Sequence, residues 1–85
     1  MVYFVYVLQN ATGAFYIGLS EDVTRGISDH NFGKSRWTRG KGPWVLVWQT
    51  ATSSLGEARK LENLLTRQKG GDGFYSITGL TRPSA

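Results

Sequence analysis

The first ten residues, MVYFVYVLQN, constrain the fold of this chain more than any other stretch. Successive side chains of a β-strand point to opposite faces of the sheet, so an extended segment here presents two sets of side chains. Both sets are apolar or aromatic: Tyr3, Val5 and Val7 on one face, and Phe4, Tyr6 and Leu8 on the other. A strand that is apolar on both faces is typical of the interior of a covered sheet. The chain is therefore predicted to build a layered domain around this strand.

The middle of the chain alternates between strand and helix patterns. A turn after the first strand leads into a second strand at 14–19, and the two strands form a hairpin. A helix is predicted to begin at Ser20, whose hydroxyl is a capping group, and to end at residues 31–33. A basic, glycine-punctuated loop at 34–42 follows. Pro43 then opens a third strand, at the one strand position where proline is tolerated.

The last third of the chain predicts a second helix. Ser54 and Glu57 have the spacing of a capping box, and Gly70-Gly71 ends the helix. Its buried stripe is predicted to be Ala58, Leu61 and Leu65. Residues 73–80 are predicted to form a short final strand or an ordered tail, and the chain end to be frayed from about residue 80 to 85. The order β-β-α-β-α predicts one α+β domain over residues 1–85.

Composition excludes several kinds of site. The chain has no cysteine, which rules out disulfides and thiolate zinc sites, and its single histidine, His30, rules out histidine clusters. A metal ion must then bind carboxylate oxygens and water, which favours Mg²⁺ or Mn²⁺. No apolar run reaches the length of a membrane span, and the N-terminus lacks the basic region of a signal peptide, so a cytoplasmic protein is expected.

The net charge of +4 favours an anionic partner, most often a nucleic acid, although mild basicity also serves solubility alone. The basic loop interleaves cations with an indole, and an indole can stack on a base while cations hold phosphates. The alternative is that Trp37 and Trp44 cover the small core. The predicted nucleic-acid contacts are Lys34, Arg36, Trp37, Arg39 and Lys41 in the loop, with Arg67 and Lys69 near the end of the second helix.

Two tyrosines and a glutamate are candidates for chemistry. Tyr6 and Tyr16 lie on neighbouring strands of the hairpin, and a phenol can orient or deprotonate a water molecule; strand tyrosines are also common core residues. Glu62 borders the apolar stripe of the second helix, so its carboxylate needs a metal ion, a hydrogen bond or a cation such as Arg59 or Arg25. Metal binding and an ion pair are equally compatible with this position.

A glycine inside the first helix stands out. Val23, Ile27 and His30 follow one another at i, i+4 and i+7, which is one stripe of a helix. Gly26 lies within this stretch, where glycine costs about 1 kcal/mol relative to alanine. Helix stability alone gives no reason for it.

Together, these residues resemble the GIY-YIG nuclease superfamily, which includes the bacterial excision-repair incision subunit and intron homing endonucleases. The first family motif corresponds to Phe4-Val5-Tyr6, in which phenylalanine replaces the usual glycine, and the second is intact as Tyr16-Ile17-Gly18. The first helix is similar to the family's helix and ends in His30-Asn31.

The second half of the chain extends the resemblance. Glu57-Ala58-x-x-x-Glu62 is similar to the family's later helix, which carries a metal-binding glutamate. The segment WTRGKGPWVLV resembles the small, stand-alone bacterial branch. The similarity runs from about Tyr3 to Lys69, and the order and spacing of the motifs are more specific than any one motif.

The resemblance implies a fold and an activity. The fold is a sheet of three antiparallel strands flanked by helices, and the activity is hydrolysis of DNA phosphodiester bonds with one Mg²⁺ or Mn²⁺. Tyr6 would act as the base or water-orienting phenol, and Tyr16 would hydrogen-bond the scissile phosphate or assist proton transfer. His30 would support the nucleophile side, and Glu62 would hold the metal.

The family also places an arginine on the first helix four residues before the histidine, and this position is Gly26 here. Arg25 is adjacent, but one helical step turns a side chain by about 100°. The glycine therefore indicates that a functional side chain has been lost at this position, through engineering or natural divergence. The site is predicted to be weakened. Arg25 takes over only if the helix turns or the phosphate shifts.

The sequence thus predicts a metal-dependent DNA endonuclease domain of reduced activity, with single-stranded or flapped DNA as the favoured substrate. A non-catalytic nucleic-acid-binding module on the same fold is the main alternative, and a protein-interaction domain is a third. Metal dependence distinguishes the first two, because a binding module needs neither Glu62 nor Mn²⁺.

Overall fold

The structure is a computed structural model that describes residues 2–33 and 40–81. Three strands form one antiparallel sheet in the order β2-β1-β3. Three helices accompany it, so the order along the chain is β-β-α-β-α-α. The elements are β1 Tyr3–Gln9, β2 Phe15–Ser20, α1 Val23–Asn31, β3 Val45–Thr52, α2 Leu55–Gln68 and α3 Asp72–Thr78.

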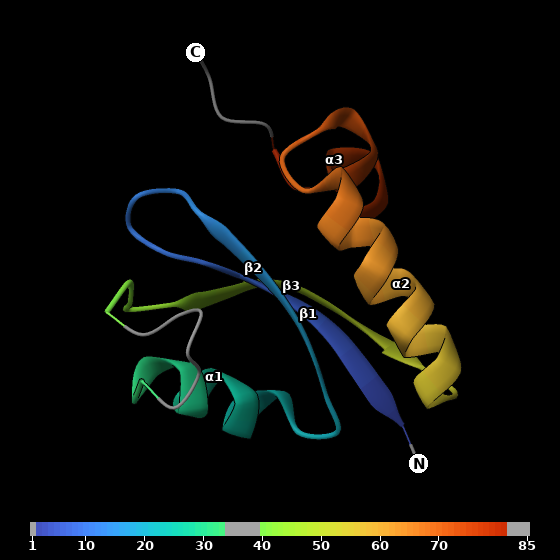
Figure 1. Ribbon diagram of the computed structural model, residues 1–85, viewed down its shortest axis with the longest axis horizontal. Helices are drawn as coiled ribbons and strands as arrows, with labels where there is room; N and C mark the ends of the chain where they lie inside the picture. Colours follow the sequence, from blue (N-terminus) through green and yellow to red (C-terminus); the bar gives the residue numbers. More distant parts are fainter. Residues whose placement is uncertain (1, 34–39, 82–85) are drawn as a thin grey trace.

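The central position of β1 confirms the interpretation of its two apolar faces. Val5 and Val7 pack under α2 and α3 with Ala58, Leu65 and Phe74, in the larger of two core clusters. Figure 1 shows α2 and α3 on one side of the sheet and α1 on the other. The second, smaller core cluster lies on the α1 side and is built from Tyr6, Leu8 and Trp44, with Tyr16, Val23, Ile27 and Leu46 packed against it.

The start of α1 differs from the prediction. The N-cap is Asp22 and not Ser20, because the Asp22 carboxylate accepts the hydrogen bond of the Arg25 backbone N–H at 3.1 Å. The Ser20 hydroxyl instead donates to the Asp22 carbonyl and accepts from the Asp22 N–H, which makes the tight turn between β2 and the helix. The predicted end is confirmed: Gly33 has a positive φ of 75°, and its N–H donates to the carbonyl of His30.

The segment predicted as a final strand or ordered tail is a helix. In α3 the side chains of Phe74 and Thr78, four residues apart, are both buried, and Phe74 is fully enclosed in the larger core cluster. Gly79 ends the helix in the left-handed conformation at φ 72°. The aromatic and β-branched composition of this segment favours a strand, but the helix buries Phe74 and leaves Ile77 exposed.

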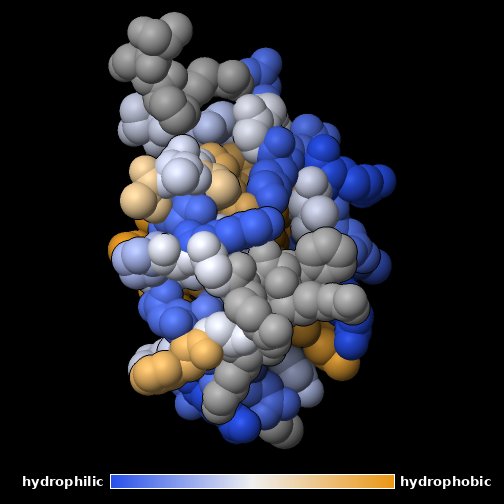
Figure 2. Space-filling model, turned by 60° about the vertical axis from the view of Figure 1, so that its left-hand side comes forward, coloured by the Kyte–Doolittle hydropathy of each residue, from blue (hydrophilic) through white to orange (hydrophobic). Residues whose placement is uncertain are grey.

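The surface is mostly hydrophilic. On the face shown in Figure 2, hydrophobic residues form small patches separated by hydrophilic ones. The large exposed hydrophobic side chains come from different parts of the fold: Val2, Phe32, Val45, Leu55 and Ile77. None of the three described helices combines the length and the hydropathy that crossing a bilayer requires.

Candidate active site between the tyrosine hairpin and the first helix

The phenol ring of Tyr6 is held between two glycines. On β2, a Cβ at Gly18 would overlap the ring, so only glycine fits opposite Tyr6 in the strand pair. On α1, a Cβ at Gly26 would lie 3.0 Å from the Tyr6 hydroxyl oxygen. Gly26 therefore has a structural role that the sequence analysis did not predict: it allows the phenol to approach the helix closely. Tyr6 is 3% exposed.

The Tyr6 hydroxyl meets His30, one turn further along α1. The distance from Tyr6 Oη to His30 Nε2 is 3.2 Å. The His30 ring also packs against Tyr16, with ring centroids 4.3 Å apart and planes inclined by 60°. The structure thus brings together Tyr6, Tyr16, Gly26 and His30, four of the residues that the sequence singled out.

Burial sets the protonation states of this pair. Burial is the largest cause that raises the pKa of Tyr6, from 10 to about 12, and the negative charges of Tyr16, Glu62 and Asp29 add to it. Burial also lowers the pKa of His30, against the opposing effect of Asp29. At neutral pH the phenol is therefore protonated and the imidazole uncharged, and in the tautomer with its proton on Nδ1 the ring accepts the Tyr6 O–H at Nε2.

The raised pKa of Tyr6 predicts a late titration. Ultraviolet difference spectroscopy should show one tyrosine ionising near pH 12, and this step should be missing in Tyr6→Phe. The folded protein keeps this proton to higher pH than the unfolded chain, so its contribution to stability is complete below pH 10 and is lost between about pH 10 and 12. Four tyrosines titrating together near pH 10 would contradict the burial argument.

A surface hollow opens beside the Tyr6–His30 pair. It is lined by Tyr6, Tyr16, Leu19, Ser20, Gly26, Asp29 and His30. Sequence reasoning missed Asp29, although its position three residues after Gly26 places it on the same helix face. Arg25 is exposed and lines an adjoining hollow that shares Ser20, Gly26 and Asp29 with the first. The guanidinium therefore borders the site from the neighbouring hollow.

Glu62 approaches the site from the other side of the sheet. Its charge acts on the pKa of Tyr6, yet Glu62 does not line the Tyr6 hollow. Glu62, Thr66 and Lys69 follow at i, i+4 and i+7, which puts them on one side of α2. Thr66 and Lys69 line a hollow together with Tyr16 of β2, so this side of α2 runs along the edge strand. The half-buried Glu62 carboxylate thus belongs to the border between β2 and α2.

Asn31 fixes the end of α1 against the start of β3. Its side-chain oxygen accepts the backbone N–H of Trp44 at 2.7 Å, and its side-chain nitrogen donates to the Trp44 carbonyl at 3.2 Å. Trp44 is 4% exposed and packs in the smaller core cluster with Tyr6. Of the two interpretations of this tryptophan, the structure supports the core residue.

The predicted nucleic-acid contacts are only partly described. Lys34, Arg36, Trp37 and Arg39 lie outside the described residues. Lys41 is exposed, and its carbonyl accepts a hydrogen bond from the Asn10 side chain. Arg67 and Lys69 are exposed at the end of α2. Among the described cations of this set, Lys41 precedes β3, and Arg67 and Lys69 lie at the end of α2.

The chain is similar in sequence to curated proteins, and in sequence and fold to a solved structure. The solution NMR structure of the UPF0213 protein BH0048 from Bacillus halodurans is 38% identical and covers 79% of this chain and 72% of its own, with a TM-score of 0.50. A UPF0213 protein of Aeromonas hydrophila is 43% identical over 67 residues, and one of Nitratidesulfovibrio vulgaris is 35% identical over 68 residues. These two alignments cover 78% and 79% of this chain, and 49% and 62% of the relatives.

The chain thus spans about half the length of the Aeromonas relative. The model of the GIY-YIG catalytic domain matches residues 2–73, which include both tyrosines, both glycines around Tyr6, His30 and Glu62. This match covers β1 through α2, the elements that hold the candidate site. The chain therefore belongs to the GIY-YIG catalytic domain family, the nuclease family that its motifs resemble.

Proposed function

We propose that this domain is an endonuclease that hydrolyses phosphodiester bonds of DNA with the help of a divalent metal ion. The observation that carries the proposal is the buried hydrogen bond between Tyr6 and His30 at the wall of an open hollow. A protonated phenol joined to an uncharged imidazole is a ready path for a proton. Hydrolysis needs such a path, because the attacking water must lose a proton.

The proposed proton path runs from water through Tyr6 to His30. As the water oxygen forms its bond to phosphorus, the P–O bond to the leaving oxygen breaks, and that oxygen takes a proton from the solvent. The proton of the attacking water passes to Tyr6 Oη while the phenol proton passes to His30 Nε2. The phenol thus remains neutral throughout, which agrees with its raised pKa. The resemblance implied that Tyr6 is either the base or a water-orienting phenol. In this proposal His30 is the base, and Tyr6 orients the water and relays its proton. Tyr16, beside His30, is positioned to hydrogen-bond a phosphate oxygen in the hollow.

The residues present fit a metal ion that the substrate helps to bind. Within residues 2–33 and 40–81, no group of three His, Cys, Asp or Glu side chains could hold a metal. Mg²⁺ is commonly bound by one or two carboxylates, with waters and substrate phosphates completing its shell. Glu62 fits this limited role, and a bound ion would stabilise the negative charge of the phosphate and the leaving oxygen.

Gly26 favours the second candidate function, a module that binds nucleic acid without cleaving it. No side chain at this position offers a positive charge to a phosphate in the hollow, and Arg25 lines the neighbouring hollow instead. Stabilisation of phosphate charge is a main contribution of proteins to phosphoryl transfer. For the endonuclease, the same missing charge implies weak cleavage. Its proposed substrate is single-stranded or flapped DNA.

The test is cleavage of a labelled oligonucleotide as Mg²⁺ or Mn²⁺ is titrated, with EDTA as the blank. Glu62→Gln should raise the metal concentration for half-maximal cleavage by about tenfold or more, because the amide keeps one oxygen but loses the charge. Affinity for DNA in EDTA should be unchanged. Cleavage that persists in EDTA, or the same metal titration for the wild-type protein and Glu62→Gln, would overturn the assignment of Glu62 as a metal ligand. DNA binding without any cleavage would support the binding module.

A further inference from the structure

Three hollows follow one another from the candidate active site to α2, and each shares one lining residue with the next. The first is the Tyr6–His30 hollow, and Tyr16 also lines the second, together with Ile17, Thr66 and Lys69. Thr66 in turn lines the third hollow, which follows α2. The shared residues Tyr16 and Thr66 make one path from the candidate active site, over the edge strand β2, to the exposed side of α2.

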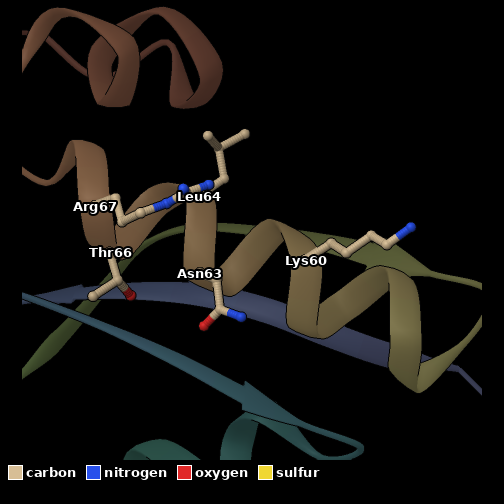
Figure 3. A pocket seen from close by; sticks show the side chains of 5 residues that line it. All are labelled: Lys60, Asn63, Leu64, Thr66 and Arg67. Atoms are coloured by element: carbon tan, nitrogen blue, oxygen red, sulfur yellow. The ribbon is translucent and has the colours of Figure 1, made fainter.

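The far end of the path is basic. Its hollow, of about 600 Å³, is lined by Lys60, Asn63, Leu64, Thr66 and Arg67. Figure 3 shows Arg67 running along α2 toward Leu64, while Lys60 projects toward the beginning of the helix. Asn63 and Thr66 lie on the other side of the helix from Leu64 in this view. The path thus offers two cations and an amide, with Lys69 as a third cation in the middle hollow.

We infer that this path binds the sugar-phosphate backbone of a single DNA strand that extends from the active site. The inference rests on the proposed function and specifies its substrate: one strand, held by Lys69, Arg67 and Lys60 after it passes over Tyr16. The first argument is charge: the cations of the path complement the negative phosphates of DNA. Proteins that bind single strands commonly hold the phosphate backbone in a positively charged groove. The chain as a whole carries a net charge of +4.

The shape of the path selects a single strand over a duplex. The path begins on the α1 side of the sheet, where Tyr16 packs against His30, and ends on α2, which covers the opposite side. Double-stranded DNA is stiff over about 150 base pairs and does not bend around the edge of one small sheet. From Lys60 to Lys69 the helix rises about 14 Å, which is the length of about four stacked nucleotides.

The experiment measures binding in EDTA by fluorescence anisotropy, so that cleavage is not needed. The probes are a single strand of about twelve nucleotides and a duplex of the same sequence. The test variant is Lys60→Gln/Arg67→Gln. We expect it to bind the single strand about tenfold more weakly, with the slope of log affinity against log salt reduced by about 1.4.

Arg59→Gln is the matched control, because Arg59 is an exposed cation of α2 that lines none of the three hollows. Equal losses of single-strand affinity in the control and in the test variant would overturn the path. Tighter binding of the duplex than of the single strand would also overturn it. If the test variant alone weakens binding of the single strand, and no metal-dependent cleavage is found, this inference stands and the proposed endonuclease activity is refuted.

Discussion

Replacing Gly26 with arginine is expected to raise metal-dependent cleavage of DNA by about 10²-fold, the scale of one preorganised charge-stabilising donor. Gly26 lines the hollow with Tyr6, Tyr16 and His30, so a side chain here enters the space that we assign to the scissile phosphate. A guanidinium stays protonated and offers a planar set of donors to phosphate oxygens. Initial rates on one labelled single strand with Mg²⁺ or Mn²⁺ measure the effect.

Gly26→Ala is the control for this gain. Both substitutions place a Cβ 3.0 Å from the Tyr6 hydroxyl oxygen, so in both proteins the phenol must yield by a few tenths of an ångström. Both also gain helix propensity, somewhat under 1 kcal/mol relative to glycine. Only arginine adds the charge. Equal cleavage by the two variants would mean that the glycine serves the packing of Tyr6 alone, and our account of the missing cation would be wrong.

Gly18→Ala is expected to destabilise the fold by about 3 kcal/mol, at the upper end of the usual cost of overpacking. The new methyl group would overlap the Tyr6 ring, which is buried. The ring cannot retreat in the other direction, because its hydroxyl already lies against Gly26 and bonds His30. Either α1 moves away from the sheet or the strand pair distorts. Urea denaturation of both proteins measures the loss.

A double-mutant cycle tests whether the Tyr6 ring is the cause. In a Tyr6→Leu background the shorter side chain leaves room for the methyl group, and Gly18→Ala should then cost under about 1 kcal/mol. The difference between the two backgrounds is the coupling of Gly18 to Tyr6. A cost of Gly18→Ala that is the same in both backgrounds would locate the strain elsewhere in β2.

The sequence predicted correctly those elements whose residue pattern fits only one structure. The segment from Tyr3 to Leu8 is apolar or aromatic at every position, so as a strand it must be covered on both faces. It forms β1, the central strand of the covered sheet. Ser54 caps α2, as its spacing from Glu57 predicts, and Ala58 and Leu65 are fully buried in the predicted stripe. The Glu57 side chain, however, accepts a hydrogen bond from Ser53 instead of completing the capping box.

Short elements were predicted less well, because local signals compete there. Asp22 and Ser20 are both good capping residues, and the choice between them depends on where β2 ends. In α3, aromatic and β-branched residues favour a strand locally, and contacts with the larger core cluster decide for a helix. Gly79 was a usable signal, since a glycine just after a short amphipathic segment is a common helix stop.

The candidate site was predicted as a set of residues but not as an arrangement. The sequence placed Tyr6, Tyr16, His30 and Glu62 together through a family resemblance, and gave no means to find the direct bond from Tyr6 to His30. That bond depends on the depth at which the phenol sits between two glycines. The position of Glu62 beside the edge of β2 likewise follows from how α2 crosses the sheet.

The paired hydrogen bonds of Asn31 have a consequence for which residues position 31 can accept. They join the end of α1 directly to Trp44, the residue that precedes β3. The side chain must supply an acceptor to the Trp44 N–H and a donor to the Trp44 carbonyl at the same time, and a side-chain amide does both. Position 31 therefore tolerates few replacements, because a carboxylate lacks the donor and an aliphatic side chain lacks both groups.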